Sequence, residues 1–526
     1  MTDPHHAVQQ RVVGAVGAIG LATFASRLLG YARDMVVASA FGAGPLTDAF
    51  FVAYRIPNLL RRLLAEGALS TALIPVFGEY LARGDAIAFA RTIRAVAGMA
   101  LLVLVAVSGL GVLLAPALVT MMTPGWTADR SLLDLAIRLT RITFPYLLLV
   151  GLGAVLTAAL NAHHRFLSAA LGPVILNLGM IGAVLLLAGH VEPPIVALAI
   201  GVLVGGVGQL AVQIPEARRL GIPLRPAWEP RHPAVRRVGV LMAPSVVGLA
   251  AVQLTVLLNT FLASLLPAGT VSYLYYADRV MEFPLGVFGI ALATAVLPTM
   301  AGQAARGERA ALTATLGWAL RLSAFIAVPA AVGLVLLAGP IVRLLFERGE
   351  FSPADAAATT RALLGYAVGL PAFSAARIAA QTFYALGDTR TPVRVGLVTL
   401  AVNVAVALAL MWPLAEAGLA LASSLASYAN LAGLLWLLRR RLGPIGGRAL
   451  VHSGGKTLAA CVPLAAWCLW ALWSGPVVRS TWGLAGWTLG VIALGTAIYV
   501  AAATLLRCAE IHGLIGLLRR RGQALR

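Results

Sequence analysis

Arginine and carboxylate side chains recur inside a part of the chain that is otherwise apolar enough to lie in a membrane. Residues 26–70 read SRLLGYARDMVVASAFGAGPLTDAFFVAYRIPNLLRRLLAEGALS and contain five arginines and three carboxylates. Only fifteen uncharged residues precede Arg27 in its segment, about 22 Å of helix, whereas the hydrocarbon core of a bilayer is about 30 Å thick. We therefore expect Arg27 to lie inside the membrane, with Arg33 one to two helical turns further on.

The second apolar segment has its charged residues on one predicted helical stripe. The stripe is formed by residues spaced seven, seven and four apart and is flanked by two further polar residues. A charged stripe that faced lipid would be costly, so we expect it to face protein or a water-filled cavity. The stripe comprises Asp48, Arg55, Arg62 and Glu66, and the flanking residues are Asn58 and Arg61.

A third charged group, Asp278, Arg279 and Glu282, lies in the segment YYADRVMEFPLG. Arg279 and Glu282 are three residues apart and can pair on a helix. Two simpler interpretations of all these charges are arginines that snorkel to the membrane surface and ion pairs that fix helix packing. The acidic residues are too few to neutralise the arginines together. The residual positive charge predicts an anionic ligand, and the planar guanidinium group suits phosphate.

The overall composition predicts an all-α polytopic membrane protein. Hydrophobic residues make up 60% of the 526 residues and charged residues 11%, against about 25% charged residues in soluble domains. The net charge of +20 is attributed to basic loops, because no segment is long and polar enough for a nucleic-acid-binding domain. Segments of about 20 apolar residues predict fourteen spans, near 12–40, 46–78, 95–122, 132–160, 167–189, 194–216, 238–266, 271–301, 311–338, 356–385, 394–411, 417–438, 456–474 and 483–506.

Arginines are concentrated in alternate loops, which places those loops and both termini on the cytoplasmic side. No catalytic centre, cofactor site or metal site is expected. The single Gly-Lys-Thr (455–457) has Leu450 where a P-loop has its first glycine. No nucleophile and base lie together in a polar segment. An intramembrane enzyme that acts on a pyrophosphate lipid remains an alternative at this point.

An internal repeat divides the chain. ALSTALIPVFGEYLARGD (68–85) matches ALATAVLPTMAGQAARGE (291–308) at 8 of 18 positions, an offset of 223 residues. Six predicted spans separate the copies, so the repeats are parallel and predict two six-helix lobes with the substrate handled between them. The predicted parts are an N-terminal lobe (1–216), a basic cytoplasmic linker (217–237), a C-terminal lobe (238–441) and two further helices with a basic tail (442–526).

The charged segments resemble the MurJ (MviN) family of lipid II flippases, in the multidrug/oligosaccharidyl-lipid/polysaccharide exporter superfamily. The resemblance covers the whole chain and includes SRLLGYARD, FGAGPLTDAFFVAYRIPNLLRRLLAEGALSTALIPVFGEY and YYADRVMEFPLGVFGIALATAVLPTM. It implies two lobes around a cationic cavity and a substrate, lipid II, that moves to the outer leaflet of the bacterial cytoplasmic membrane. It also implies that the last two helices hold the polyprenyl tail of the lipid. The residues that match the family's functional cavity positions are Arg27, Arg33, Arg61 and Arg279, joined by Asp48, Asn58, Glu66 and Glu282, with Arg55 in place of a lysine.

One departure from the family concerns sodium, which some members bind through carboxylates in the second lobe. Spans 238–266 and 394–411 contain no Asp or Glu, and a hard cation prefers carboxylate oxygens, so no sodium site is expected. Two alternatives to lipid II transport remain. One is a flippase for another polyprenyl-linked oligosaccharide or a drug exporter, although an exporter of cationic drugs needs an acidic cavity. The other is a membrane scaffold that recruits peptidoglycan-synthesis proteins through its arginine-rich loops.

Overall fold

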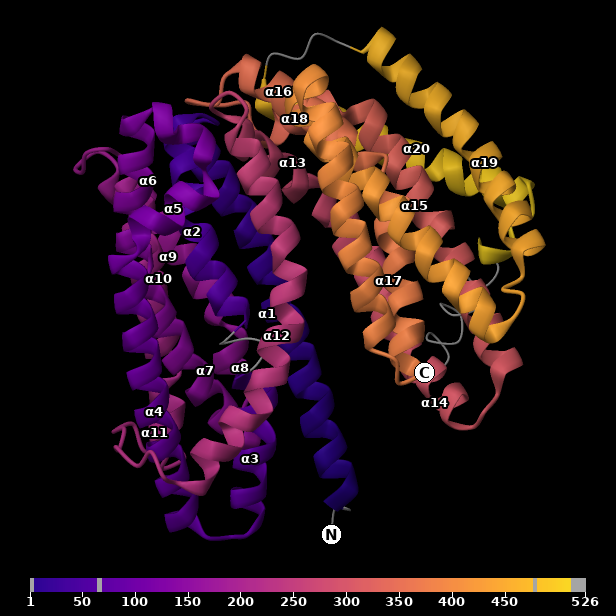
Figure 1. Cartoon of the computed structure of the whole chain (residues 1–526). Helices are drawn as coiled ribbons and strands as arrows, with labels where there is room; N and C mark the ends of the chain where they lie inside the picture. Colours follow the sequence, from indigo (N-terminus) through magenta and orange to yellow (C-terminus); the bar gives the residue numbers. More distant parts are fainter. Residues whose placement is uncertain (1–3, 64–68, 476–479, 512–526) are drawn as a thin grey trace. The chain divides into compact units, whose positions relative to one another are not determined.

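The computed structural model describes residues 4–63, 69–475 and 480–511, which are mostly helical and contain no β-strand. The all-α class predicted from composition is confirmed. The chain divides into two compact units, each described here by itself (Figure 1). The N-terminal unit comprises Met1–Ser272 with Gly349–Phe351, and the C-terminal unit comprises Tyr273–Arg348 with Ser352–Arg526.

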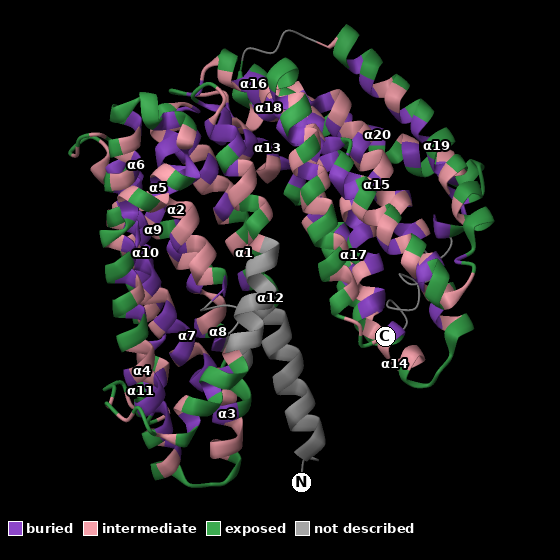
Figure 2. Cartoon of the chain, viewed as in Figure 1, coloured by how far each residue is buried: buried purple, intermediate pink, exposed green. Residues whose placement is uncertain are grey.

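The N-terminal unit is a bundle in which α9 packs along both α10 and α1, and α2 packs along α6. Most buried residues line the inner faces of these helices (Figure 2). Its elements are α1 (Pro4–Phe41), α2 (Pro45–Leu60), α3 (Ser70–Ala82), α4 (Ala86–Leu113), α5 (Ala115–Met122), η2 (Pro124–Ala128), α6 (Arg130–Thr143), α7 (Tyr146–Ala162), α8 (Leu167–Ala170), α9 (Gly172–Leu187), α10 (Val196–Ala211), α11 (Ile214–Arg219) and α12 (Pro233–Ser264).

The C-terminal unit is a second bundle, in which α15 packs against α16, α17 and α19, and α18 packs against α16 and α17. The long helix α18 contains two of the predicted spans. Ala415, with φ 47°, breaks the helix between them. Its elements are α13 (Thr270–Pro284), the π-helix η3 (Leu285–Ile290), α14 (Ala291–Ala305), α15 (Arg309–Phe346), α16 (Pro353–Ala367), α17 (Leu370–Ala385), α18 (Arg390–Leu442), α19 (Gly447–Ser474) and α20 (Thr481–Leu505).

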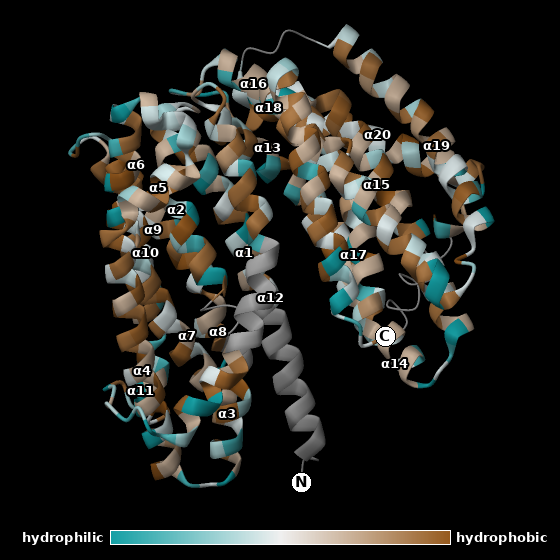
Figure 3. Cartoon of the chain, viewed as in Figure 1, coloured by the Kyte–Doolittle hydropathy of each residue, from teal (hydrophilic) through white to brown (hydrophobic). Residues whose placement is uncertain are grey.

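Apolar residues cover most helices in both units (Figure 3). Within the part of the chain that the structure describes, nine helices are long and apolar enough to cross a membrane, or ten if the bent pair α16 and α17 is one span. The break in α18 adds another span to that number. Three predicted spans, 12–40, 46–78 and 238–266, are not in this count because they contain undescribed side chains or several charges. Shorter apolar helices, Ala72–Ala82 and Gln253–Ser264, represent the second and third of them.

The two copies of the internal repeat have the same helix ends. Helices α3 and α14 end at Ala82 and Ala305, and α7 and α17 end at Ala162 and Ala385, each pair 223 residues apart. A cluster of buried residues in each unit also uses equivalent positions. The structure therefore supports the duplication that the short sequence match predicted. Equivalent buried pairs are Phe77 and Met300, Ile93 and Leu316, Val155 and Ile378, and Leu160 and Phe383.

Each copy also leaves the α-helical conformation at the same point. Residues 61–63 are π-helical after the end of α2, and η3 after α13 includes Leu285 and Gly286, which lie 223 residues after Arg62 and Leu63. Short π-helical segments inside α-helices are often found at functional sites. A π-helical turn also changes which residues share a face, so a stripe predicted on uniform helical spacing does not extend past Leu60.

The predicted linker 217–237 packs on α4 within the N-terminal unit. The Ala227 amide donates to the Arg94 carbonyl at 2.9 Å, and Arg91 pairs with Glu229 at 2.7 Å. Helix α12, predicted as the first helix of the second lobe, packs against α3, α4 and α5 in the same unit. The N-terminal compact unit therefore extends to Ser272, whereas the predicted C-terminal lobe begins at residue 238. The boundaries of the lobes stay a prediction.

Gly98 is the position where the linker approaches α4 most closely. A Cβ atom at Gly98 would lie 2.0 Å from the Ala227 carbonyl oxygen. We expect Gly98→Ala to lower the free energy of unfolding by about 1–3 kcal/mol, because the linker backbone has to shift. Thermal unfolding of the purified protein measures this. Gly109→Ala on the same helix is the matched control, since no atom lies within 4 Å of its added Cβ, and an unfolding temperature equally lowered in both variants would contradict the prediction.

The two helices outside the repeat, α19 and α20, pack on α15 in the C-terminal unit. The Tyr499 hydroxyl donates to the Phe325 carbonyl at 2.7 Å, and Arg321 pairs with the buried Glu510 at 3.3 Å. Trp467 donates to the Val491 carbonyl, whereas Trp473 and Trp482 are almost fully exposed. These contacts attach the last two helices to the repeat through α15.

Candidate functional site

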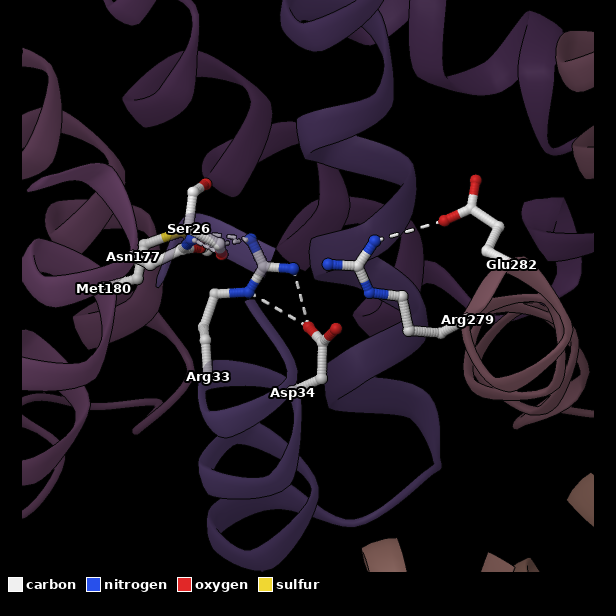
Figure 4. Close-up of polar contacts among 7 residues, drawn as sticks. All are labelled: Ser26, Arg33, Asp34, Asn177, Met180, Arg279 and Glu282. Carbon is white, nitrogen blue, oxygen red and sulfur yellow. Dashed lines mark hydrogen bonds and ion pairs between the residues drawn. The ribbon is translucent and has the colours of Figure 1, made fainter. Parts of the chain in front are cut away.

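Arg33 on α1 is held by groups on two helices. Its Nε and Nη2 donate to Asp34 Oδ1 at 3.0 and 2.7 Å, and its Nη1 donates to Asn177 Oδ1 at 3.1 Å. Arg33 is 13% exposed and Asp34 is 2% exposed. Figure 4 shows the guanidinium group between the carboxylate and the α9 side chains, which include Met180. Arg33 is therefore an oriented cation rather than one that snorkels.

Asn177 is a site residue that the sequence prediction missed. It lies on α9 and is 6% exposed. Its Nδ2 donates to the Ser26 carbonyl of α1 at 3.1 Å, in addition to its bond with Arg33. The available signal was an amide in the otherwise apolar run LGPVILNLGMIG, because polar groups in membrane spans usually have a partner or a function.

Two arginines of the predicted site are exposed and make no polar contact with any described residue. These are Arg27 on α1 and Arg62 in the π-helical segment after α2. An exposed arginine inside an apolar helix has to face water or a polar ligand, since facing lipid is costly. Among the predicted site arginines that the structure describes in this unit, Arg27 and Arg62 are therefore the exposed ones.

The other residues of the second span have partners within the N-terminal unit. Arg55 donates to the Thr260 hydroxyl and, at 3.5 Å, to the Val256 carbonyl on α12. Arg61 donates to Asn58 Oδ1 at 3.0 Å. The residues of the predicted stripe therefore have different surroundings. Arg55 binds α12, whereas Asn58, Arg61 and Arg62 lie in or next to the π-helical segment. Glu66 lies outside the described residues.

Asp48 is buried and caps the first turn of α13. It is 1% exposed, and it accepts from the Gly269 amide at 2.6 Å and from the Ser272 amide at 2.8 Å. The Ser272 hydroxyl donates to the same carboxylate at 2.5 Å. A carboxylate at a helix N-terminus satisfies free amide groups and interacts favourably with the helix dipole. The structure thus gives Asp48 a contact with backbone, whereas the sequence predicted contact with substrate.

The charged group of the C-terminal unit is on α13. Arg279 donates to Glu282 Oε2 at 3.2 Å (Figure 4), and the pairing expected from their spacing is confirmed. Arg279 is 27% exposed and Glu282 is 50% exposed. Asp278 is half-buried beside them. An exposed pair of this kind contributes little to stability.

The chemistry of the site is that of an anion-binding surface. Its arginines supply planar, permanently charged donors, which suit phosphate oxygens. In the described ranges no group of three or more His, Cys, Asp or Glu residues is arranged to hold a metal ion. The helical units and their cationic residues define a polytopic membrane protein. Its fold is that of a transporter, and the protein is not an enzyme.

Known proteins of similar sequence identify the family. The model of the family "Lipid II flippase MurJ" matches residues 37–490, and this chain belongs to the MurJ family of lipid II flippases. It is 36% identical over 517 residues to a probable lipid II flippase MurJ of Vibrio cholerae, covering 95% of this chain and 97% of the relative. It is 37% identical over 385 residues to the lipid II flippase MurJ of Burkholderia cenocepacia, covering 72% and 75%. The resemblance inferred from the charged segments is confirmed.

Solved structures show the same fold. A lipid II flippase MurJ in an inward closed conformation has a TM-score of 0.77 at 23% identity and covers 93% of this chain and 98% of that one. An inward-facing multidrug resistance MATE family transporter of the MOP superfamily has a TM-score of 0.64 at 16% identity, covering 80% and 95%. The fold of the chain is therefore that of a multi-span membrane transporter.

Proposed function

We propose that this chain moves lipid II from the cytoplasmic to the outer leaflet of a bacterial inner membrane. The observation that carries the proposal is the exposed Arg27 in the apolar helix α1, with the oriented Arg33 six residues further along the same helix. Lipid II carries a pyrophosphate, and guanidinium groups bind phosphate oxygens with two parallel bonds. Membership of the MurJ family supports lipid II as the particular pyrophosphate lipid.

In this mechanism no covalent bond of the substrate changes. The arginines bind the pyrophosphate and the sugar-peptide head group in a cationic cavity. The acidic residues orient the arginines and weaken binding enough for release. Alternate opening of the lobes to each side of the membrane moves the head group. The proposed substrate-binding set is Arg27, Arg33, Arg55, Asn58, Arg61, Arg62, Glu66, Asp278, Arg279 and Glu282, and the buried Asp48 supports it as the cap of α13.

The proposed orientation places both termini and the linker 217–237 in the cytoplasm, since the arginines are concentrated in those loops. The same cytoplasmic surface is the proposed contact for peptidoglycan-synthesis proteins. Trp228 supports this contact, because it is 64% exposed on the linker and exposed aromatic residues are enriched in protein interfaces. The proposed path of the polyprenyl tail is along α19 and α20. Val462, Leu469 and Trp473 are exposed on α19, and Leu489 is exposed on α20.

Depletion of the protein in cells that have no other lipid II flippase tests the proposed function. A reagent restricted to the periplasm labels lipid II only in the outer leaflet. We expect labelled lipid II to fall to background during depletion and to return when the gene is restored. If labelling persists without the protein, the proposed function is wrong. Parallel labelling of another polyprenyl-pyrophosphate oligosaccharide separates lipid II transport from transport of a related lipid.

A further inference from the structure

The amide of Asn177 joins α9 to two points on α1. Its Nδ2 binds the Ser26 carbonyl and its Oδ1 accepts from Arg33, both at 3.1 Å. Ser26 and Arg33 are seven residues apart, so they lie on one face of α1 two turns from each other. Figure 4 shows Ser26, Asn177 and Arg33 gathered at this point. A single buried side chain thus fixes the segment of α1 that contains both Arg27 and Arg33.

We infer that Asn177 is a positioning residue for the substrate-binding Arg33 of α1. The inference rests on the proposed function, because it assigns a role toward the same anionic substrate. Asn177 touches the Arg33 side chain and the Ser26 carbonyl, and it acts on the substrate through Arg33.

An amide is the side chain that this position requires. Asn177 has to accept from a guanidinium group and donate to a carbonyl at once, and an amide offers both an acceptor and two donors. The opposite orientation of the amide would place its NH2 group against the Arg33 donors. An aspartate would keep the acceptor, but its second oxygen would face the Ser26 carbonyl. A leucine of similar size would satisfy neither group.

The contact orders Arg33 before any ligand arrives. Asp34 holds the Nε and Nη2 edge of the guanidinium group, and Asn177 holds Nη1. A long side chain that is already fixed loses less conformational freedom when it binds a ligand, so it binds more tightly. The bond to Ser26 also fixes the backbone immediately before Arg27, which has no side-chain partner in the described part of the chain.

The competing explanation is that Asn177 only attaches α9 to α1, two helices that pack closely. A purely packing role predicts a loss of stability that does not depend on Arg33. A positioning role predicts a loss of lipid II affinity that disappears when Arg33 is absent. A double-mutant cycle distinguishes these cases, because residues in contact are coupled and separate residues are additive.

The experiment measures the affinity of the purified full-length chain for lipid II in lipid nanodiscs. We expect Asn177→Leu to weaken binding about tenfold in the native background and at most about twofold in Arg33→Ala. In Arg62→Ala the effect should remain about tenfold, since Arg62 makes no contact with Asn177. Asn177→Ser is measured in parallel, because it preserves folding if leucine does not, and we expect it to weaken binding in the same direction.

Gln213→Leu is the matched control. Gln213 is another buried amide of the N-terminal unit, 4% exposed, and it bonds Thr157 and the Gln209 carbonyl without touching α1. We expect lower thermal stability and unchanged lipid II affinity for Gln213→Leu. Equal weakening by Asn177→Leu with and without Arg33, or unchanged affinity, would overturn the positioning role. If the unaltered chain itself fails to bind lipid II, the proposed function fails instead.

Discussion

Replacing Arg27 with alanine is expected to weaken lipid II binding by about 10- to 100-fold, the effect of losing a hydrogen-bonded charge of about 1.5–3 kcal/mol. Arg27 is exposed on an apolar helix and has no partner among the residues that the structure describes. Its side chain therefore has no polar contact to lose among the described residues, and the substitution should leave folding intact. Binding of lipid II to the purified protein and outer-leaflet labelling in depleted cells measure the effect.

Arg27→Lys and Arg343→Ala complete that experiment. Lysine keeps the charge but not the planar pair of donors, so we expect Arg27→Lys to retain an intermediate affinity. Arg343 is also exposed, at 56%, and pairs with Glu347 four residues later on the surface. Its removal should change stability by about 0.5 kcal/mol or less and leave transport unchanged. Full complementation by Arg27→Ala at normal expression would contradict the cationic site.

The helices and their repetition were predictable because hydrophobic burial repeats along the sequence. The buried positions of the two copies, such as Phe77 and Met300, follow the same offset as the short sequence match. The long apolar helices, nine or ten of them among the described residues, were predictable from apolar length alone. The two spans joined in α18 show the limit of this reasoning, since their separation rests on a single residue, Ala415, with an unusual backbone conformation.

The partners of the charged residues were not predictable, because they depend on which helices pack together. Spacing along the chain identified the pair of Arg279 and Glu282 on one helix. It could not identify Asn177, which is 144 residues from Arg33, or the backbone amides that Asp48 caps. The π-helical residues 61–63 also changed the register that the predicted stripe had assumed. Pairs of charged residues within one helix could therefore be predicted from the sequence, whereas their contacts with other helices could not.

The second large effect is expected for Asp48→Ala, which should lower the free energy of unfolding by about 3 kcal/mol and reduce transport. The substitution leaves two amides and a hydroxyl at the start of α13 without their acceptor, and each unsatisfied buried donor costs about 1–3 kcal/mol. The chain passes from the N-terminal to the C-terminal unit between Ser272 and Tyr273. A looser first turn of α13 should therefore change how the two units move during transport.

Ser272→Ala and Asp85→Ala separate the parts of this effect. Ser272→Ala removes one of the three donors and should cost about 1 kcal/mol. Asp85 also caps a helix, by accepting from the Ile87 and Ala88 amides, but it lies on an exposed turn. Its loss should cost about 1 kcal/mol without affecting transport, because water replaces the cap. If Asp48→Ala unfolds at the temperature of Asp85→Ala and transports normally, the buried carboxylate has no role beyond an ordinary helix cap.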